Sequence, residues 1–185
     1  MSSRTEYSDS ELLKLFRNED SKSFAFNLIV RQYQERLYWH IRKILVSHED
    51  TNDTLQETFM KIWVGLEKFR ADSKLYTWMY RIATNEALSL IKQKRRKFLL
   101  PIVDVEKGMQ NLLESDSYFD GNEAQKKLQK AILRLPQKQR IVFNMKYFDE
   151  MKYNDMSEIL DTTVGALKAS YHHAVKKIEK FLETD

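Results

Sequence analysis

Residues 53–96 read DTLQETFMKIWVGLEKFRADSKLYTWMYRIATNEALSLIKQKRR, and this stretch predicts two amphipathic helices separated by a short polar break. In the first helix apolar residues recur at steps of three or four, so they share one face that needs a core. These residues are Leu55, Phe59, Ile62, Leu66 and Phe69. The opposite face presents Asp53, Gln56, Glu57, Met60 and Lys61 to solvent or to a partner.

The polar break at residues 70–74 is followed by a helix that Asp72 or Ser73 is expected to cap. Its inward face is predicted to hold Met79, Ile82, Ala83, Leu90 and Ile91. A second stripe becomes basic toward its end and comprises Thr77, Arg81, Thr84, Asn85, Leu88, Lys92 and Arg95. The pair suggests one surface for a protein and one for nucleic acid, although solvated charges on an ordinary helical hairpin explain the pattern as well.

The composition favours an all-α protein of one large or two small domains. Only four Gly and two Pro occur in 185 residues, too few for the many turns of a barrel or sandwich. The net charge of +4 is a mild basic bias, compatible with nucleic acid. The absence of Cys fits a reducing cytoplasm. No apolar run is long enough for a membrane span, and the polar start is no signal peptide, so we expect a cytoplasmic protein without membrane insertion.

Two further helices are expected before the opening stretch. Ser8 or Asp9 is predicted to begin the first, and Ser21 or Ser23 the second and longer one. Residues 47–50 are interpreted as a break that ends the second helix.

An acidic linker is predicted to divide the chain into two helical domains, residues 1–98 and 125–185. Within residues 101–125 six acidic residues stand against the single base Lys107, and Pro101 stops any helix. We therefore expect residues 99–124 to be an extended or partly disordered linker.

The second domain carries a helix-turn-helix pattern. Helices are predicted up to Pro136, over residues 137–147 and over residues 155–160, and Thr163 is expected to cap the last one. That last helix presents a row of small, basic and histidine side chains: Gly165, Ala166, Lys168, Ala169, His172 and Lys176. Small residues at the start of a recognition helix let its backbone approach DNA closely. A compact four-helix bundle without DNA binding would show a similar pattern.

Four motifs together resemble a known family. QETFMKIW at 56–63, TWMYRIATNEA at 77–87, LPQKQRIVF at 135–143 and VGALK at 164–168 stand in the order and spacing of a bacterial RNA polymerase sigma factor of the extracytoplasmic-function (ECF) group. The resemblance covers roughly residues 21–182, with the linker unmatched.

The resemblance implies a function and three sets of site residues. Proteins of this family bind core RNA polymerase, melt the −10 promoter element with the first domain and read the −35 element with the second. Polymerase would be met by Asp53, Gln56, Glu57 and Met60. The −10 region would be met by Arg70, Asp72, Ser73, Lys74, Tyr76, Arg81, Asn85, Lys92, Arg95 and Arg96. The −35 duplex would be met by Thr163, Gly165, Ala166, Lys168, Ala169, His172 and Lys176.

The family also implies partners and shows where this chain differs. Core RNA polymerase, promoter DNA and an anti-sigma factor are the expected partners. The chain has Ala169–Ser170 where the family often has Ser-Arg, and His173 where it often has Arg. It also has Ser157 where the family often has Ala, and Asp161 where it often has Gly; Asp tolerates a left-handed turn at modest cost.

A protein without ATPase motifs can open DNA only by stabilising the opened strand, through stacking and hydrogen bonds to an unstacked base. The polar loop at 70–74 lies beside Tyr76, Trp78 and Tyr80, which are the residue types required. At helical spacing, however, Trp78 is more often a core residue than a platform for a base, and Trp63 is expected in the core or at the polymerase contact.

The sequence gives no indication of catalysis, a cofactor or a metal site. It contains no Gly-rich phosphate loop, no HExxH motif and no paired carboxylates in an apolar setting, and its four His do not form a ligand set. Two rival interpretations remain: a dimeric regulator that binds duplex DNA without polymerase, and a helical protein-interaction module.

Overall fold

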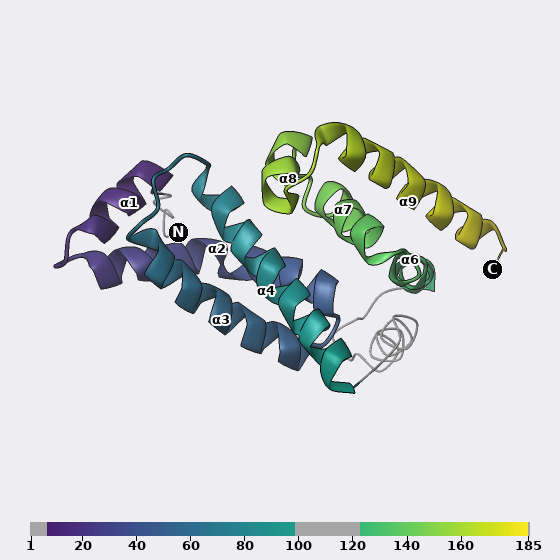
Figure 1. The fold of residues 1–185 in the computed structure, drawn as a ribbon, viewed down its shortest axis with the longest axis horizontal. Helices are drawn as coiled ribbons and strands as arrows, with labels where there is room; N and C mark the ends of the chain where they lie inside the picture. Colours follow the sequence, from purple (N-terminus) through teal and green to yellow (C-terminus); the bar gives the residue numbers. More distant parts are fainter. Residues whose placement is uncertain (1–6, 99–122, 185) are drawn as a thin grey trace.

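The computed structural model describes residues 7–98 and 123–184, and every regular element in those ranges is an α-helix (Figure 1). The predicted all-α fold is confirmed. The helices are α1 (Asp9–Arg17), α2 (Lys22–Leu45), α3 (His48–Leu66), α4 (Leu75–Phe98), α6 (Glu123–Leu133), α7 (Gln137–Tyr147), α8 (Tyr153–Leu160) and α9 (Val164–Thr184). The predicted linker 99–124 lies outside the described residues, apart from Glu123 and Ala124, which begin α6.

Helices α1–α4 form the N-terminal half and share one core. Apolar side chains from all four helices are fully buried there, among them Phe16, Ile29, Leu37, Ile62 and Met79. Burial of this apolar area is the main favourable term for folding. None of the helices in the described part of the chain is long and apolar enough to cross a membrane.

Serine residues begin the first three helices, which corrects one expected boundary. Ser8 forms a capping box with Glu11, and Ser21 precedes α2, both as predicted. Ser47 accepts a hydrogen bond from the Asp50 amide at 3.2 Å and is the N-cap of α3. The second helix ends before Ser47, as predicted, but the break is shorter than expected. Residues 48–50 are the first turn of α3, where acidic side chains favour the positive end of the helix dipole.

The start of α4 depends on a side chain from α1. The Leu75 amide donates to Asp9 Oδ2 at 3.3 Å, and the Tyr33 hydroxyl donates to Asp9 Oδ1 at 3.1 Å. The helix begins at Leu75, so the prediction that Asp72 or Ser73 caps it is wrong. Asp9 of α1 instead bonds to both α2 and α4. The rules that predict helix caps from sequence look only at neighbouring residues, so they could not find a contact between residues 9 and 75.

Threonine residues take core positions that the sequence pattern assigned to other side chains. Thr54 and Thr58 of α3 are buried, whereas Leu55 and Phe59 are half-buried. Thr77 and Thr84 of α4, predicted on the polar stripe, are buried as well. The hydroxyls of Thr58 and Thr84 each donate to the carbonyl four residues earlier at 2.7 Å, which satisfies them without solvent.

Helices α6–α9 form the C-terminal half, and α8 and α9 make the predicted helix-turn-helix. A small core joins α6, α7 and α9 through Ile132, Leu135, Phe143 and Ile178. Asp161 ends α8 in the left-handed conformation, with φ 49° and ψ 54°, as the sequence allowed. Thr163 accepts a hydrogen bond from the Ala166 amide at 3.2 Å, so the predicted cap of α9 is confirmed.

The two halves pack against each other rather than standing apart. Helix α2 contacts α7, and α4 contacts α8, which lies beside the first turns of α4 in Figure 1. Buried residues of α7 and α8, such as Met145 and Met156, belong to the same apolar cluster as the core of the N-terminal half. The placement of the C-terminal half is therefore fixed partly by apolar burial.

Candidate functional site

The exposed face of α3 carries all four residues expected to meet polymerase. Asp53, Gln56, Glu57 and Met60 are exposed, and the Met60 side chain is 56% accessible. The sequence interpretation missed Val64, which is 66% exposed one turn beyond Met60 and extends the same face. Val64 follows Met60 by four residues, and this helical spacing would have predicted that both lie on the same face. The face thus combines apolar side chains with acidic neighbours, a composition suited to a protein partner.

A second surface runs along α4 and the loop before it. Arg70, Asp72, Lys74, Arg81, Asn85, Lys92 and Arg96 are exposed, and Ser73, Tyr76 and Arg95 are half-buried. The stretch from Tyr76 to Arg96 is about 30 Å long at the rise of an α-helix, so these side chains form a stripe rather than one pocket. Ala71 turns the loop with a positive φ of 61°. Such a basic and polar stripe suits an extended strand of nucleic acid.

The exposed face of α9 is the third surface. Gly165, Ala166, Lys168, Ala169, His172 and Lys176 are all exposed, as is Thr163 at the cap. Leu167, Ala174 and Ile178 are buried and hold the opposite face of the helix in place. A Cβ added at Gly165 would meet no atom within 4 Å, so the first turn of α9 is open for a close approach.

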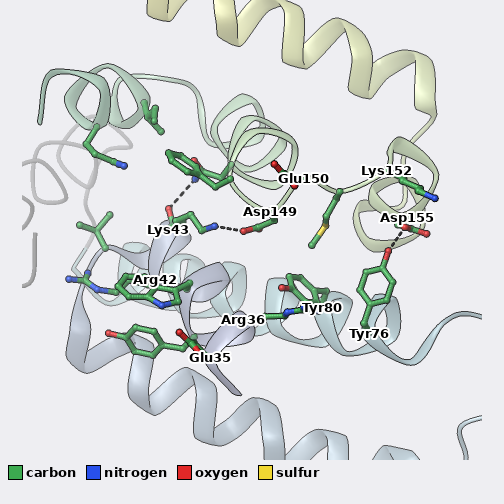
Figure 2. Close-up of a pocket in the computed structure, with 18 of the residues that line it drawn as sticks. Glu35, Arg36, Arg42, Lys43, Tyr76, Tyr80, Asp149, Glu150, Lys152 and Asp155 are labelled. Atoms are coloured by element: carbon green, nitrogen blue, oxygen red, sulfur yellow. Dashed lines mark hydrogen bonds and ion pairs between the residues drawn. The ribbon is translucent and has the colours of Figure 1, made fainter. Parts of the chain in front are cut away.

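The stripe on α4 is partly covered by α8. The Tyr76 hydroxyl donates to Asp155 Oδ2 (Figure 2). Lys74 Nζ lies 3.0 Å from Asp155 Oδ1. Burial and the hydrogen bond to Asp155 raise the pKa of Tyr76 to about 12, so the phenol stays a donor at neutral pH. Burial raises the pKa of Asp155, but the bonds to Tyr76 and Lys74 outweigh it and hold that pKa below its ordinary value of 3.8. Asp155 is therefore a charged acceptor.

Further along α4, Arg81 and Asn85 line a cleft against α8. This cleft has a volume of about 430 Å³, and its other wall includes Glu158, Ile159 and Asp161. Two residues expected to contact the −10 region therefore face the C-terminal half in this structure.

A second polar contact joins α2 to the turn after α7. Lys43 Nζ donates to Asp149 Oδ1, and His40 Nδ1 lies 3.4 Å from Asp149 Oδ2. His40 is buried, and its other nitrogen lies 2.8 Å from the Thr84 hydroxyl. Sequence reasoning missed these residues, because no local pattern reports a pair that is more than 100 residues apart along the chain. The contact borders a cavity of about 1190 Å³ between the two halves (Figure 2).

The two tryptophans whose roles were left open pack against the core of the N-terminal half. Trp63 lies edge-on to Phe16 and Phe26, with ring centroids 5.3 and 4.9 Å away. The Trp78 ring lies 4.8 Å from Phe69. Both side chains are half-buried and pack against the apolar cluster of the N-terminal half. Within the described ranges, no group of three or more His, Cys, Asp or Glu residues could hold a metal ion.

Comparison with solved structures agrees with the fold. The chain is similar to the sigma factor RpoE of Bartonella quintana, solved with the anti-sigma factor NepR, at a TM-score of 0.67 and 19% identity, covering 86% of this chain and 98% of that one. It is also similar to CnrH, solved with the cytosolic domain of CnrY, at a TM-score of 0.69 and 19% identity, covering 96% and 99%. At this identity the likeness concerns the fold alone.

Comparison of sequences extends the likeness to family. Residues 29–97 match the model of Sigma-70 region 2, and residues 125–178 match that of Sigma-70, region 4. The chain is 31% identical to the ECF RNA polymerase sigma factor SigW of Bacillus subtilis, covering 92% of this chain and 94% of that protein. It is 29% identical to the RNA polymerase sigma-H factor of Pseudomonas aeruginosa, covering 97% and 96%. With both regions present in order and a relative of this identity over almost its whole length, the chain belongs to the ECF family of RNA polymerase sigma factors.

Proposed function

We propose that this protein binds core RNA polymerase and directs promoter-specific initiation by reading the −35 duplex and melting the −10 element. The observation that carries the proposal is the presence of both family regions in one chain, each with an exposed surface of suitable chemistry. Residues 1–98 are assigned to polymerase and the −10 element, and residues 125–185 to the −35 element, with residues 99–124 as the linker. The protein would act in the cytoplasm.

Polymerase binding is assigned to the face of α3 around Asp53, Glu57 and Met60. Its exposed Met and Val side chains can be buried against a partner, and the carboxylates can pair with basic residues at the rim. The alternative interpretation, a regulator that binds duplex DNA without polymerase, does not explain why this face is apolar and exposed.

Promoter contacts are divided between the other two surfaces. The start of α9, with Gly165 and Ala166, is open to a major groove, and Lys168, His172 and Lys176 follow on the same exposed side. The loop at 70–74 with Tyr76 and Asn85 is assigned to the opened −10 strand, and the basic end of α4, with Lys92 and Arg96, to the neighbouring duplex.

An anti-sigma factor is proposed as a further partner. The similar structures of RpoE and CnrH were solved with NepR and with the cytosolic domain of CnrY. Competition between such a partner and core polymerase for this chain would support the assignment, and binding of both at once would contradict it.

In vitro transcription with core polymerase and genomic fragments, followed by sequencing of the RNA 5′ ends, tests the function. We expect start sites that share one pair of upstream elements and that vanish when the protein is omitted. Duplex binding without any new start site would favour the polymerase-independent regulator.

A further inference from the structure

The exposed face of α9 carries two adjacent histidines that take no part in holding the fold together. His172 and His173 are both exposed, and their ring centroids lie 6.0 Å apart. Within residues 7–98 and 123–184, neither ring makes a hydrogen bond or an ion pair. His172 was expected at the −35 duplex, whereas sequence reasoning left His173 out. The nitrogens of both rings are therefore available to a ligand.

The charged groups near the two rings lie on α9 itself and are mostly basic. Within two turns of the pair the helix exposes four lysines and one glutamate: Lys168, Lys176, Lys177, Lys180 and Glu179. Helices α6, α7 and α8 pack on the other face of α9, around Leu167 and Ile178. In the described part of the chain none of their charged side chains contacts either histidine; Arg134 of α6 lies over the Phe181 ring instead.

This setting makes the charge of the two rings depend on what lies against α9. In the free chain the neighbouring lysines disfavour a further positive charge on either imidazole. Phosphates of a bound duplex would neutralise those lysines and favour the same charge. Histidine is the side chain whose charge ordinarily changes between pH 5 and 8, so a small change in its surroundings decides its protonation.

The place of the pair along α9 suits phosphates better than base edges. The first residues of a recognition helix lie on base edges, and here these are Gly165 and Ala166. His172 comes nine residues after the cap Thr163, which is about 13 Å at the rise of an α-helix. That distance exceeds the major groove's width of about 12 Å, so side chains there reach toward its rim. A charged imidazolium donates from both nitrogens, and its bonds to phosphate are stronger than those of the neutral ring.

We propose that His172 and His173 are proton-linked phosphate contacts of α9, so that affinity for promoter duplex rises as the pH falls from about 8 to 6. The proposal rests on the assignment of α9 to the −35 duplex. Binding would take up protons, because phosphate favours the charged form of each ring. Lysine and arginine side chains stay charged throughout this range, so the pH dependence of this surface would come from the two histidines.

Affinity measured against pH tests the linkage. The protein is bound to core polymerase, and the probe is a labelled promoter duplex that carries the −35 element found by sequencing RNA 5′ ends. Between pH 8.5 and pH 6.0 at fixed salt, affinity should rise by up to about fivefold for each histidine, the difference between a neutral and a charged hydrogen bond. The salt slope should also be steeper at pH 6.0, by up to about 1 for each additional phosphate contact.

Variants separate the two histidines from the titratable groups of polymerase. His172→Gln and His173→Gln should each lose part of the rise in affinity, and the double variant supplies the profile of polymerase alone. His173→Arg carries a fixed charge, so it should bind more tightly than the parent at pH 8.5 and depend less on pH. His48→Gln, an exposed position on α3, is the matched control and should keep the parent's profile. Thermal unfolding of each variant checks that the helices remain folded.

The outcomes distinguish this inference from the proposed function. A steeper pH profile and a larger change of salt slope in the parent than in the double variant support proton-linked contacts. If the promoter is bound and the two proteins share one profile and one salt slope, the inference is overturned and the assignment of α9 stands. A profile carried by one histidine alone overturns the assignment of the other. If the parent with polymerase binds no promoter at any pH, the proposed function fails, and the inference fails with it.

Discussion

Gly65 of α3 and Gly165 of α9 are both helical glycines, but their surroundings predict opposite effects of an added methyl group. A Cβ at Gly65 would lie 2.7 and 3.0 Å from two carbons of the Trp78 ring, and Phe69 packs against that ring. A Cβ at Gly165 meets nothing within 4 Å. The same residue type therefore serves packing at one site and access at the other.

We expect Gly65→Ala to destabilise the protein and Gly165→Ala to stabilise it. Overpacking typically costs about 1–3 kcal/mol, which exceeds the roughly 0.5–1 kcal/mol that Ala gains over Gly in a helix. Gly165→Ala should raise the free energy of unfolding by up to about 1 kcal/mol. Urea unfolding measures both. In a Trp78→Leu background the cost of Gly65→Ala should shrink, and an unchanged cost would show that the ring is not its cause.

At the scale of elements, α3, α4 and α9 each bury one face in the core and expose the opposite face, which carries the residues proposed to bind a partner. On α3 that face carries the exposed Asp53 and Glu57, and Lys61 at its edge is paired with Glu86 of α4 at 2.6 Å. Charge changes on α3 can therefore be made without disturbing the core.

Asp53→Arg and Glu57→Arg should weaken binding to core polymerase without unfolding the protein. Loss of one partner of a charged contact at an interface typically costs about 2–5 kcal/mol. Asp20→Arg is the matched control, because Asp20 is exposed in the connection between α1 and α2. Affinity measured with labelled polymerase, beside thermal unfolding of each variant, gives the result. Parent-like binding by both α3 variants would remove this face from the assignment.

The α4 and α9 surfaces should fail in different ways. If Lys176 contacts a phosphate as proposed, promoter binding by Lys176→Ala should weaken, recover partly at low salt and show a salt slope lower by about 1. Asn85→Ala and Ser73→Ala should leave duplex affinity nearly intact and reduce open complex, seen as permanganate-reactive thymines, at every salt concentration.

A template with a premelted −10 bubble separates these two classes further. It should restore transcription by the α4 variants and not by Lys176→Ala, because only the former lack the means to hold an opened strand. Equal rescue of both classes would mean that the two helices do not divide the work as assigned.

At the scale of the whole molecule, the halves are joined by apolar burial and by two carboxylates. The contact of Asp155 should make the stability of the folded protein depend on pH. Its pKa lies below 3.8 in the folded chain, because Tyr76 and Lys74 outweigh the effect of burial. A carboxyl with a lowered pKa stabilises the structure above its ordinary pKa, and that stabilisation is lost as the pH falls through the folded-state value.

Comparison of the parent with Asp155→Asn across pH checks this. The parent should melt at a higher temperature than the variant, by a constant margin between pH 7 and pH 5. The margin should shrink only below a pH of about 4, where the carboxyl becomes protonated. A margin that already vanishes between pH 7 and pH 5 would show that another group is responsible.

The sequence alone determined the helical fold, the order of most helices and their family, because these follow from local signals: apolar periodicity, serine and threonine caps, and motifs in a fixed order. It placed the exposed residues of α3 and α9 well, because the buried side of each helix is marked by its own apolar residues. It placed Thr77 and Thr84 of α4 on a polar stripe, although both are buried. The Thr84 hydroxyl is bonded to its own helix, and such a hydroxyl can take a position in the core. Only the tertiary structure decided that Asp9 holds the start of α4, that His40 and Lys43 contact Asp149, and that Asp155 bonds to Lys74 and Tyr76. Each of these contacts joins side chains distant in sequence, and its free energy depends on burial and on a partner's position, neither of which any local pattern contains.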